Sequence, residues 1–199
     1  MQFEHLGVRP RIHPSAVIAP TAVISGDVHI GADCQVLHGA VITSEGGAIT
    51  LGQSVIVMEN ALIRATATNP VHIGDHVLVG PMASVSGATV GDETFLATGT
   101  RVFNGATIGE RSEVRINAVV HLRTVLPPES TVPIGWVAVG DPVCILSPDR
   151  HEEIWAAQRE LDFPGYVFGL DRDTPDLMAQ LTERYGRSLA RHADDMPVD

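Results

Sequence analysis

The sequence is short of cysteine, of basic residues and of long apolar segments, and each shortage excludes a class of protein. Only two cysteines, Cys34 and Cys144, occur among 199 residues, and they lie far apart, so no disulfide is expected. Lysine and arginine together number 13 against 24 acidic residues. The resulting net charge of −11 argues against a nucleic acid or an anionic membrane surface as a partner.

Signals for export, membrane insertion and several common chemistries are also missing. No apolar run reaches the length of about 18 residues that a membrane span needs, and residues 1–5 contain neither a basic leader nor an apolar stretch. We therefore expect a soluble cytoplasmic protein. The phosphate-loop, GxSxG, CxxC and HExxH motifs are absent as well.

What the sequence does contain is an aliphatic residue at almost every sixth position. The series comprises Ile18, Ile24, Ile30, Val36, Ile42, Leu51, Val57, Ile63, Ile73, Val79, Val85, Val90, Leu96, Val102, Ile108, Val114 and Val120. The residue two places earlier is nearly always small or β-branched. Because residues two apart in a strand share a face, both positions point inward and six residues form one side of a coil.

A repeat of six predicts a parallel β-helix, in which each rung depends on its neighbours to bury its apolar side. We expect an all-β solenoid, a parallel β-helix of about seven coils over roughly residues 8–146, with neighbouring coils about 4.8 Å apart. Extra residues at 44–47 and 67–70 interrupt the period and should bulge from corners, on the face that solenoids often use for binding. At another corner, five glycines that follow inward aliphatics suit turns with positive φ, and the acids after them suit water.

After the repeat the pattern becomes helical. We divide the chain into a β-helix (1–146), a helical appendage (147–195) and a frayed tail (196–199). Helix signals predict one helix over about 148–161, capped by Ser147, and a second that opens at 173–175 and carries an apolar stripe. The stripe should lie against the three-sided prism that the stacked coils form, or against a neighbouring subunit.

The repeat also predicts which side chains stack in columns. One column, directly after the inward aliphatic on every third side, contains Thr43, Arg64, Ser86, Phe103 and His121. A second column on another corner contains Pro20, His38, Glu59, Pro81, Thr98 and Ile116. In the first column His121 is expected to be a surface or interface histidine, because it stands too far from Ser86 for direct catalysis.

Three phrases resemble one known family. These are IGDHVLVG at 73–80, VSGATVG at 85–91 and WVAVGDP at 136–142, together with the bulge after the second coil. Over roughly residues 8–160 the chain is similar to gamma-class carbonic anhydrases. The resemblance implies a left-handed β-helix, a homotrimer, and a zinc ion held at each subunit interface by three histidines.

The residues at the three positions that the resemblance assigns to zinc are Arg64, Pro81 and Ser86, and none is a histidine. The family's proton-transfer residues would fall near Thr43, Glu45 and Met58. Since zinc prefers imidazole, thiolate or carboxylate ligands, we expect no zinc, no metal ligands and no other cofactor at this place. Carbonic anhydrase activity therefore does not follow from the fold.

We predict instead a pocket for a small anionic molecule at the subunit interface. Arg64, Ser86, Thr43 and Phe103 of one subunit, with Met58, Pro81 and Thr98 of the next, would bind the ligand. His38 and Glu59 stand one coil apart and could supply a general base. Arg64 and Glu59 could equally form an intersubunit ion pair that only holds the trimer together.

Two other functions stay open. The fold is shared with hexapeptide acyltransferases, which would require acyl-CoA and a histidine base, although no basic patch for the phosphates is evident. A non-catalytic assembly subunit is the other alternative. A zinc hydratase with relocated ligands would need His38, His121 and Glu59 to converge.

Overall fold

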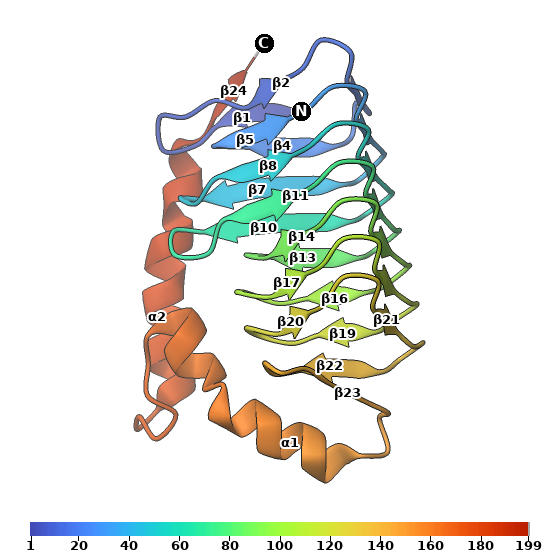
Figure 1. Ribbon diagram of the computed structural model, residues 1–199. Helices are drawn as coiled ribbons and strands as arrows, with labels where there is room; N and C mark the ends of the chain where they lie inside the picture. Colours follow the sequence, from blue (N-terminus) through green and yellow to red (C-terminus); the bar gives the residue numbers. More distant parts are fainter. Residues whose placement is uncertain (199) are drawn as a thin grey trace.

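The computed structural model describes residues 1–198 and consists of a parallel β-helix followed by two α-helices (Figure 1). Three sheets form the three sides of the coil, and successive coils pair in parallel; antiparallel strand pairs occur only at the two ends of the ten-stranded sheet, within the described residues. The side with the most strands gives about eight turns, one more than the spacing predicts. The additional turn arises because β1 (Gln2–Glu4) pairs with the next coil and extends the prism ahead of residue 8.

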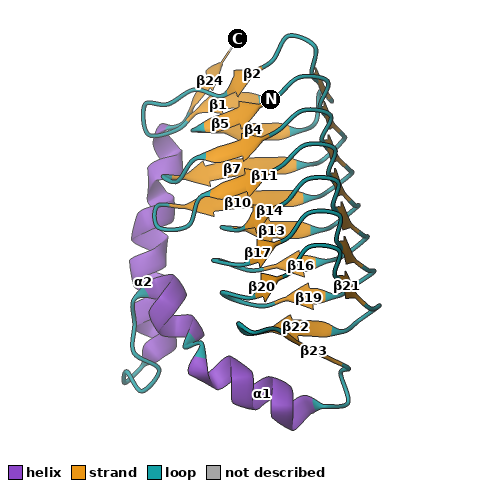
Figure 2. Cartoon of the chain, in the orientation of Figure 1, coloured by secondary structure: helices purple, strands orange, loops and turns teal. Residues whose placement is uncertain are grey.

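The strands are short and follow one another around the prism (Figure 2). The ten-stranded sheet contains β1, β4 (Val23–Ser25), β7 (Val41–Glu45), β10 (Leu62–Thr66), β13 (Ser84–Ser86), β16 (Arg101–Val102), β19 (Val119–Val120), β22 (Val137–Val139), β23 (Cys144–Leu146) and β24 (Met196–Val198). The first seven-stranded sheet contains β2 (Arg11–Ile12), β5 (Val28–Ile30), β8 (Ile49–Leu51), β11 (Val71–Ile73), β14 (Thr89–Val90), β17 (Thr107–Ile108) and β20 (Val125–Leu126). The second contains β3 (Val17–Ile18), β6 (Gln35–Val36), β9 (Ile56–Val57), β12 (Leu78–Val79), β15 (Phe95–Leu96), β18 (Glu113–Val114) and β21 (Thr131–Val132).

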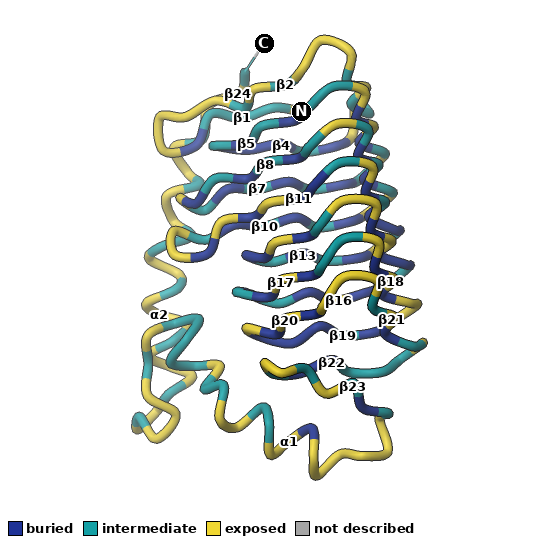
Figure 3. Tube along the Cα trace, in the orientation of Figure 1, coloured by how far each residue is buried: buried dark blue, intermediate teal, exposed yellow. Residues whose placement is uncertain are grey.

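The predicted inward positions form the core. All the aliphatic residues of the six-residue series are buried except Ile18, which is half-buried in the first coil. Cys34 fills one of the small inward positions, where burial raises the pKa of its thiol. Figure 3 shows buried positions recurring in successive coils along the β-helix, and these residues form one continuous core cluster. The hydrophobic period and the β-helix prediction are therefore confirmed.

The predicted positions of the five corner glycines are correct, but the predicted reason for them, a positive φ, is wrong. None of these glycines has a positive φ. The positive φ angles fall two residues later, at Asp33, Ser54, His76, Glu93 and Arg111. Glycine is needed because coils stack closely there: a Cβ on Gly31 would lie 2.3 Å from the carbonyl oxygen of Gly52, which no side chain can accommodate.

The acids of that corner bind the backbone of the adjacent coil. Asp75 Oδ1 accepts a hydrogen bond from the backbone N–H of Gln53 at 2.8 Å, and Asp92 Oδ1 accepts one from the N–H of Asp75 at 2.8 Å. Each carboxylate therefore replaces a carbonyl acceptor that the turn does not supply.

Replacement of Asp92 by alanine should lower the free energy of unfolding by about 0.5–1 kcal/mol, because the N–H of Asp75 loses its protein acceptor at an exposed site. Urea unfolding at fixed protein concentration measures the change. Asp92→Asn is the matched control and should retain most of the stability, since the amide oxygen can still accept. Equal losses in the two variants would contradict a hydrogen-bonding role.

Both predicted helices are present, but each begins later than expected. Helix α1 (His151–Glu160) starts after Arg150, with no side-chain cap from Ser147, and buries Ile154 against the last coil. Between the helices lies a π-helical turn, η1 (Pro164–Phe168), in the segment between the two predicted helices. Helix α2 (Leu177–Leu189) then runs back alongside the prism (Figure 1).

The tail is not frayed over the described residues. A 3₁₀ turn, η2 (Ala190–Asp194), leads into β24, which pairs antiparallel with β1 and matches Glu4 with Met196. The expectation was wrong because the tail's short sequence gives no strand period, while β1 offers it a free edge. Asp199 lies outside the described residues. No helix within residues 1–198 combines the length and apolar character that a bilayer span requires.

Candidate functional site

The first predicted column is present. Strand β10 lies between β7 and β13, and the pairing aligns Arg64 with Thr43 on one side and with Ser86 on the other. The side chains follow buried Ile42, Ile63 and Val85, so alternation directs them away from the core. Spacing alone thus placed these three residues side by side.

The second column also stacks in the predicted order, on a different corner. Successive coils are joined there by backbone hydrogen bonds, such as Asn60 N–H to His38 and Met82 N–H to Glu59. His38 and Glu59 are both exposed, and the imidazole Nδ1 of His38 lies 2.8 Å from the hydroxyl of Thr21. No hydrogen bond joins His38 to Glu59 among the described residues. Their catalytic role stays a prediction, as does the binding role of Met58, Pro81 and Thr98.

Arg64 lies beneath helix α2. Its guanidinium is 5.4 Å from the ring centroid of Tyr185, and Nη2 is 3.6 Å from Oε1 of Glu45, which is on the first bulge. The Arg64 Nε–H is buried and has no hydrogen-bond partner. The ion pair that the structure gives to Arg64 is thus within its own chain. An intersubunit pair with Glu59 stays a prediction.

A pocket of about 420 Å³ opens between the coils and α2, and we call it the arginine pocket. Arg64, Ser86 and Asn104 line it from the coils. Arg184 and Arg191 line it from α2 and η2. The two interruptions of the repeat contribute Glu45, Ala67 and Thr68, so extra residues of both bulges line this cavity. That this face binds a ligand stays a prediction.

The arginine pocket is cationic in a strongly acidic chain. Three arginines line it against one carboxylate, that of Glu45. Arg184 Nη1 donates to the carbonyl of Gly169 at 3.2 Å, and Arg191 donates to the carbonyl and hydroxyl of Ser188 at 3.0 Å. These acceptors are neutral, so the positive charge of the two guanidiniums is not balanced by them. Such a site favours an anion that accepts hydrogen bonds from guanidinium.

Three residues of the first column lie outside the arginine pocket. Thr43 lines a neighbouring hollow on the other side of Arg64, together with Phe3 and Val23. Phe103 packs on His121, with ring centroids 5.5 Å apart. His121 was expected at a surface or interface but is buried, and burial lowers its pKa. The surface alternative for His121 was wrong because the stacked Phe103 covers a position that the repeat alone leaves facing outward. The interface alternative stays a prediction.

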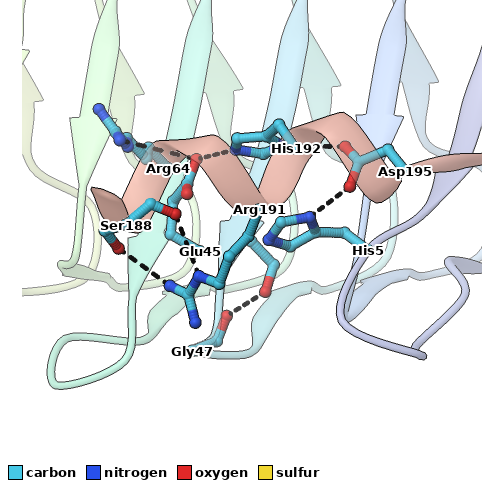
Figure 4. A network of polar contacts seen from close by, with 9 residues as sticks. His5, Glu45, Gly47, Arg64, Ser188, Arg191, His192 and Asp195 are labelled. Carbon is cyan, nitrogen blue, oxygen red and sulfur yellow. Dashed lines mark hydrogen bonds and ion pairs between the residues drawn. The ribbon is translucent and has the colours of Figure 1, made fainter. Parts of the chain in front are cut away.

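Sequence reasoning missed a polar chain that begins at Arg64. Figure 4 shows it running through Glu45 and His192 to Asp195 and His5. His192 Nε2 is 2.9 Å from Oε1 of Glu45, and His192 Nδ1 is 2.8 Å from Oδ2 of Asp195. The hydrogen bond to Asp195 raises the pKa of His192; burial opposes the rise and the bond to Glu45 adds to it. The only signal in the sequence was the His192/Asp195 spacing, at the end of the segment interpreted as a helical appendage.

Comparison with known proteins identifies the group. No family model matches the chain. It is 30% identical over 151 residues to "Gamma carbonic anhydrase 1, mitochondrial" of Arabidopsis thaliana, covering 73% of this chain and 53% of that protein. It is also 30% identical over 110 residues to a carbonic anhydrase of Geobacillus kaustophilus, covering 55% and 60%. The chain belongs to the gamma-carbonic-anhydrase-like hexapeptide-repeat proteins.

The sequence match covers only part of the relatives' length, and the structural match shows only a shared fold. The chain spans about half the length of the Arabidopsis relatives that it matches. A putative acetyltransferase of Bacillus cereus superposes with a TM-score of 0.64 at 21% identity, covering 95% of this chain and 98% of the other, and shows the shared fold alone. Because the Arabidopsis relative is named as mitochondrial, the expected cytoplasmic location stays a prediction.

The residues at the family's implied zinc positions do not fit zinc. Arg64 and Ser86 are neighbours on β10 and β13, but a guanidinium already paired with Glu45 repels a dication, and a serine hydroxyl is a poor ligand. Pro81 has no donor atom in its side chain. No chemical step is therefore assigned to zinc in the gamma-carbonic-anhydrase-like site of this chain.

Proposed function

We propose that this gamma-carbonic-anhydrase-like protein binds a small carboxylate or similar anion in the arginine pocket, without a metal in that pocket. The observation that carries the proposal is the set of three arginines, Arg64, Arg184 and Arg191, around one cavity that holds a single carboxylate. A planar guanidinium with two free donors matches a carboxylate bidentately.

The roles of individual residues follow from their positions. Arg64 is fixed on a central strand, where stacking on Tyr185 and pairing with Glu45 limit its rotamers, so it would hold the anion with little loss of entropy. Ser86 and Asn104 add uncharged hydrogen-bonding groups along the same wall. Arg184 and Arg191 are exposed and would attract the ligand at the opening of the arginine pocket.

One chain lines this pocket, so binding itself does not require a neighbouring subunit. We still expect a homotrimer, which the family implies, and Pro81, Thr98, Met58, His38 and Glu59 would then reach the ligand only from another subunit. The proposal is therefore one of binding. Any catalysis by His38 or Glu59 depends on that assembly.

Calorimetric titration of the full chain, after treatment with a chelator, tests the proposal. We expect a small mono- or dicarboxylate, bicarbonate or inorganic phosphate to bind, with an affinity that falls as salt is added. At 100 times Kd the ligand should stabilise the native state by about 2.7 kcal/mol and raise its melting temperature. Binding that appears only after zinc is added would overturn the metal-free pocket. Binding of acyl-CoA alone would favour the acyltransferase, and binding of none of these would favour the assembly subunit.

A further inference from the structure

A second cluster of ligating groups lies where the two ends of the chain meet, and we call it the terminal cluster. It comprises His5, His192 and Asp195, whose potential ligand atoms all lie within 4.8 Å of one another. The pairing of β1 with β24 creates it, because matching Glu4 with Met196 sets His5 opposite Asp195. Residues 187 positions or more apart in sequence thus converge through the tertiary fold, as Figure 4 shows.

Both imidazoles present the same atom to one carboxylate. Nδ1 of His5 is 2.5 Å from Oδ1 of Asp195, and Nδ1 of His192 is 2.8 Å from Oδ2. The two rings stack with centroids 4.3 Å apart and an interplanar angle of 21°. These contacts bring two imidazole nitrogens and one carboxylate together, one residue from the N-terminal segment and two from the C-terminal segment.

Glu45 fixes the orientation of one ring from behind. It lies 2.9 Å from Nε2 of His192, so a proton on Nε2 leaves the Nδ1 lone pair directed at Asp195. A carboxylate that holds the far nitrogen of a histidine is the usual support of a metal-bound imidazole. In that tautomer the lone pair and the carboxylate repel each other unless a cation lies between them, whereas in the imidazolium Nδ1–H donates to Asp195.

The burial of the terminal cluster also suits a metal ion. The side chain of His5 is 1% exposed and its Nε2 has no partner, whereas those of Asp195 and His192 are 16% and 33% exposed. One face is therefore dry and the other open to water, which could complete the coordination. We propose that His5, His192 and Asp195 bind a zinc-class divalent cation, which ties the C-terminal segment to the first strand.

Two nitrogens and one carboxylate oxygen are the ligands that zinc and neighbouring late divalent metals accept, with water in the fourth position. The site lies apart from the arginine pocket and is joined to it through Glu45, which also contacts Arg64. The metal would thus anchor η2 and the end of α2 over the anion site. The competing arrangement has no metal: His192 carries both protons and bridges Glu45 and Asp195 as an imidazolium.

Metal content of the full-length protein tests the proposal directly. The purified chain is stripped with a chelator, incubated with equimolar zinc, desalted and assayed by elemental mass spectrometry. We expect about one zinc per chain. Asp195→Asn and His192→Gln should bind zinc at least about 100-fold more weakly in chelator competition. His72→Gln, an exposed histidine on β11, is the matched control and should behave as the wild type.

Two further readouts separate a metal site from a structural ion pair. Cobalt(II) should give visible d–d absorption in the wild type and in His72→Gln but not in His192→Gln, and circular dichroism confirms that each variant is folded. Zinc should raise the melting temperature of the wild type and of His72→Gln, and should leave that of His192→Gln unchanged. Absence of tight zinc, or equal binding by His192→Gln, would overturn the proposal and favour the imidazolium bridge. Anion titration in the presence of chelator keeps this result independent of the proposed function.

Discussion

Replacement of Arg64 by methionine should abolish anion binding and leave the β-helix folded. Methionine keeps the apolar stem that packs near Tyr185 but removes the guanidinium. Arg64→Met removes two hydrogen bonds to a charged ligand, each worth about 1.5–3 kcal/mol. The dissociation constant Kd should therefore rise by a factor of about 100 or more. Calorimetry with the anion found for the wild type measures the change.

Two controls define what that loss means. Arg64→Lys keeps the charge without the planar donor pair and should lose less affinity than methionine. Arg11→Met removes an exposed guanidinium from β2, elsewhere on the coil, and should bind as the wild type. Sedimentation of each variant reports assembly. If Arg64→Met dissociates the oligomer and yet binds the anion normally, Arg64 holds subunits together and the proposed site is wrong.

Replacement of Ile63 by alanine should lower the free energy of unfolding by about 2–5 kcal/mol, the largest stability effect that we expect from one side chain. Ile63 is completely buried on β10, between Ile42 and Val85 of the adjacent coils. Truncation leaves a cavity that the stacked coils cannot close, because each rung is fixed by the rungs on both sides. Urea unfolding followed by circular dichroism, at one protein concentration, gives the value.

A graded series tests the packing explanation. Ile63→Val removes one methylene group and should cost about 0.5–1.5 kcal/mol. Ile134→Ala makes the same truncation at a residue that is 62% exposed, and should change stability by no more than about 0.5 kcal/mol. Equal losses at positions 63 and 134 would show that the six-residue period does not mark the core. Because Arg64 follows Ile63 on the strand, weaker anion binding by Ile63→Ala is expected as a secondary effect.

Much of the coil could be predicted from spacing because its contacts are local and repeat at a nearly constant offset. Arg64 pairs with Thr43 and Ser86, about one coil away in each direction, so counting residues placed them together. The same counting failed for side chains whose surroundings come from elsewhere. His121 was expected at a surface or an interface, yet within the chain it is buried and stacked on Phe103.

The corner glycines show a second limit of pattern reasoning. Their positions were predicted, but the reason given, a positive φ, was wrong. The structure shows that a Cβ would collide with the next coil, as for Gly31 against Gly52. A recurring glycine signals that a side chain is not tolerated. It does not distinguish backbone conformation from close approach.

The sequence by itself determined the β-helix, its inward residues, the order of its columns and the face that carries the bulges, because strand alternation and stacking act over one coil. Only the tertiary structure decided that α2 covers Arg64 and that His5 meets Asp195 across 190 positions. Those contacts depend on where a helix and a terminal strand find exposed apolar surface and a free sheet edge. No local period in the chain records either of them.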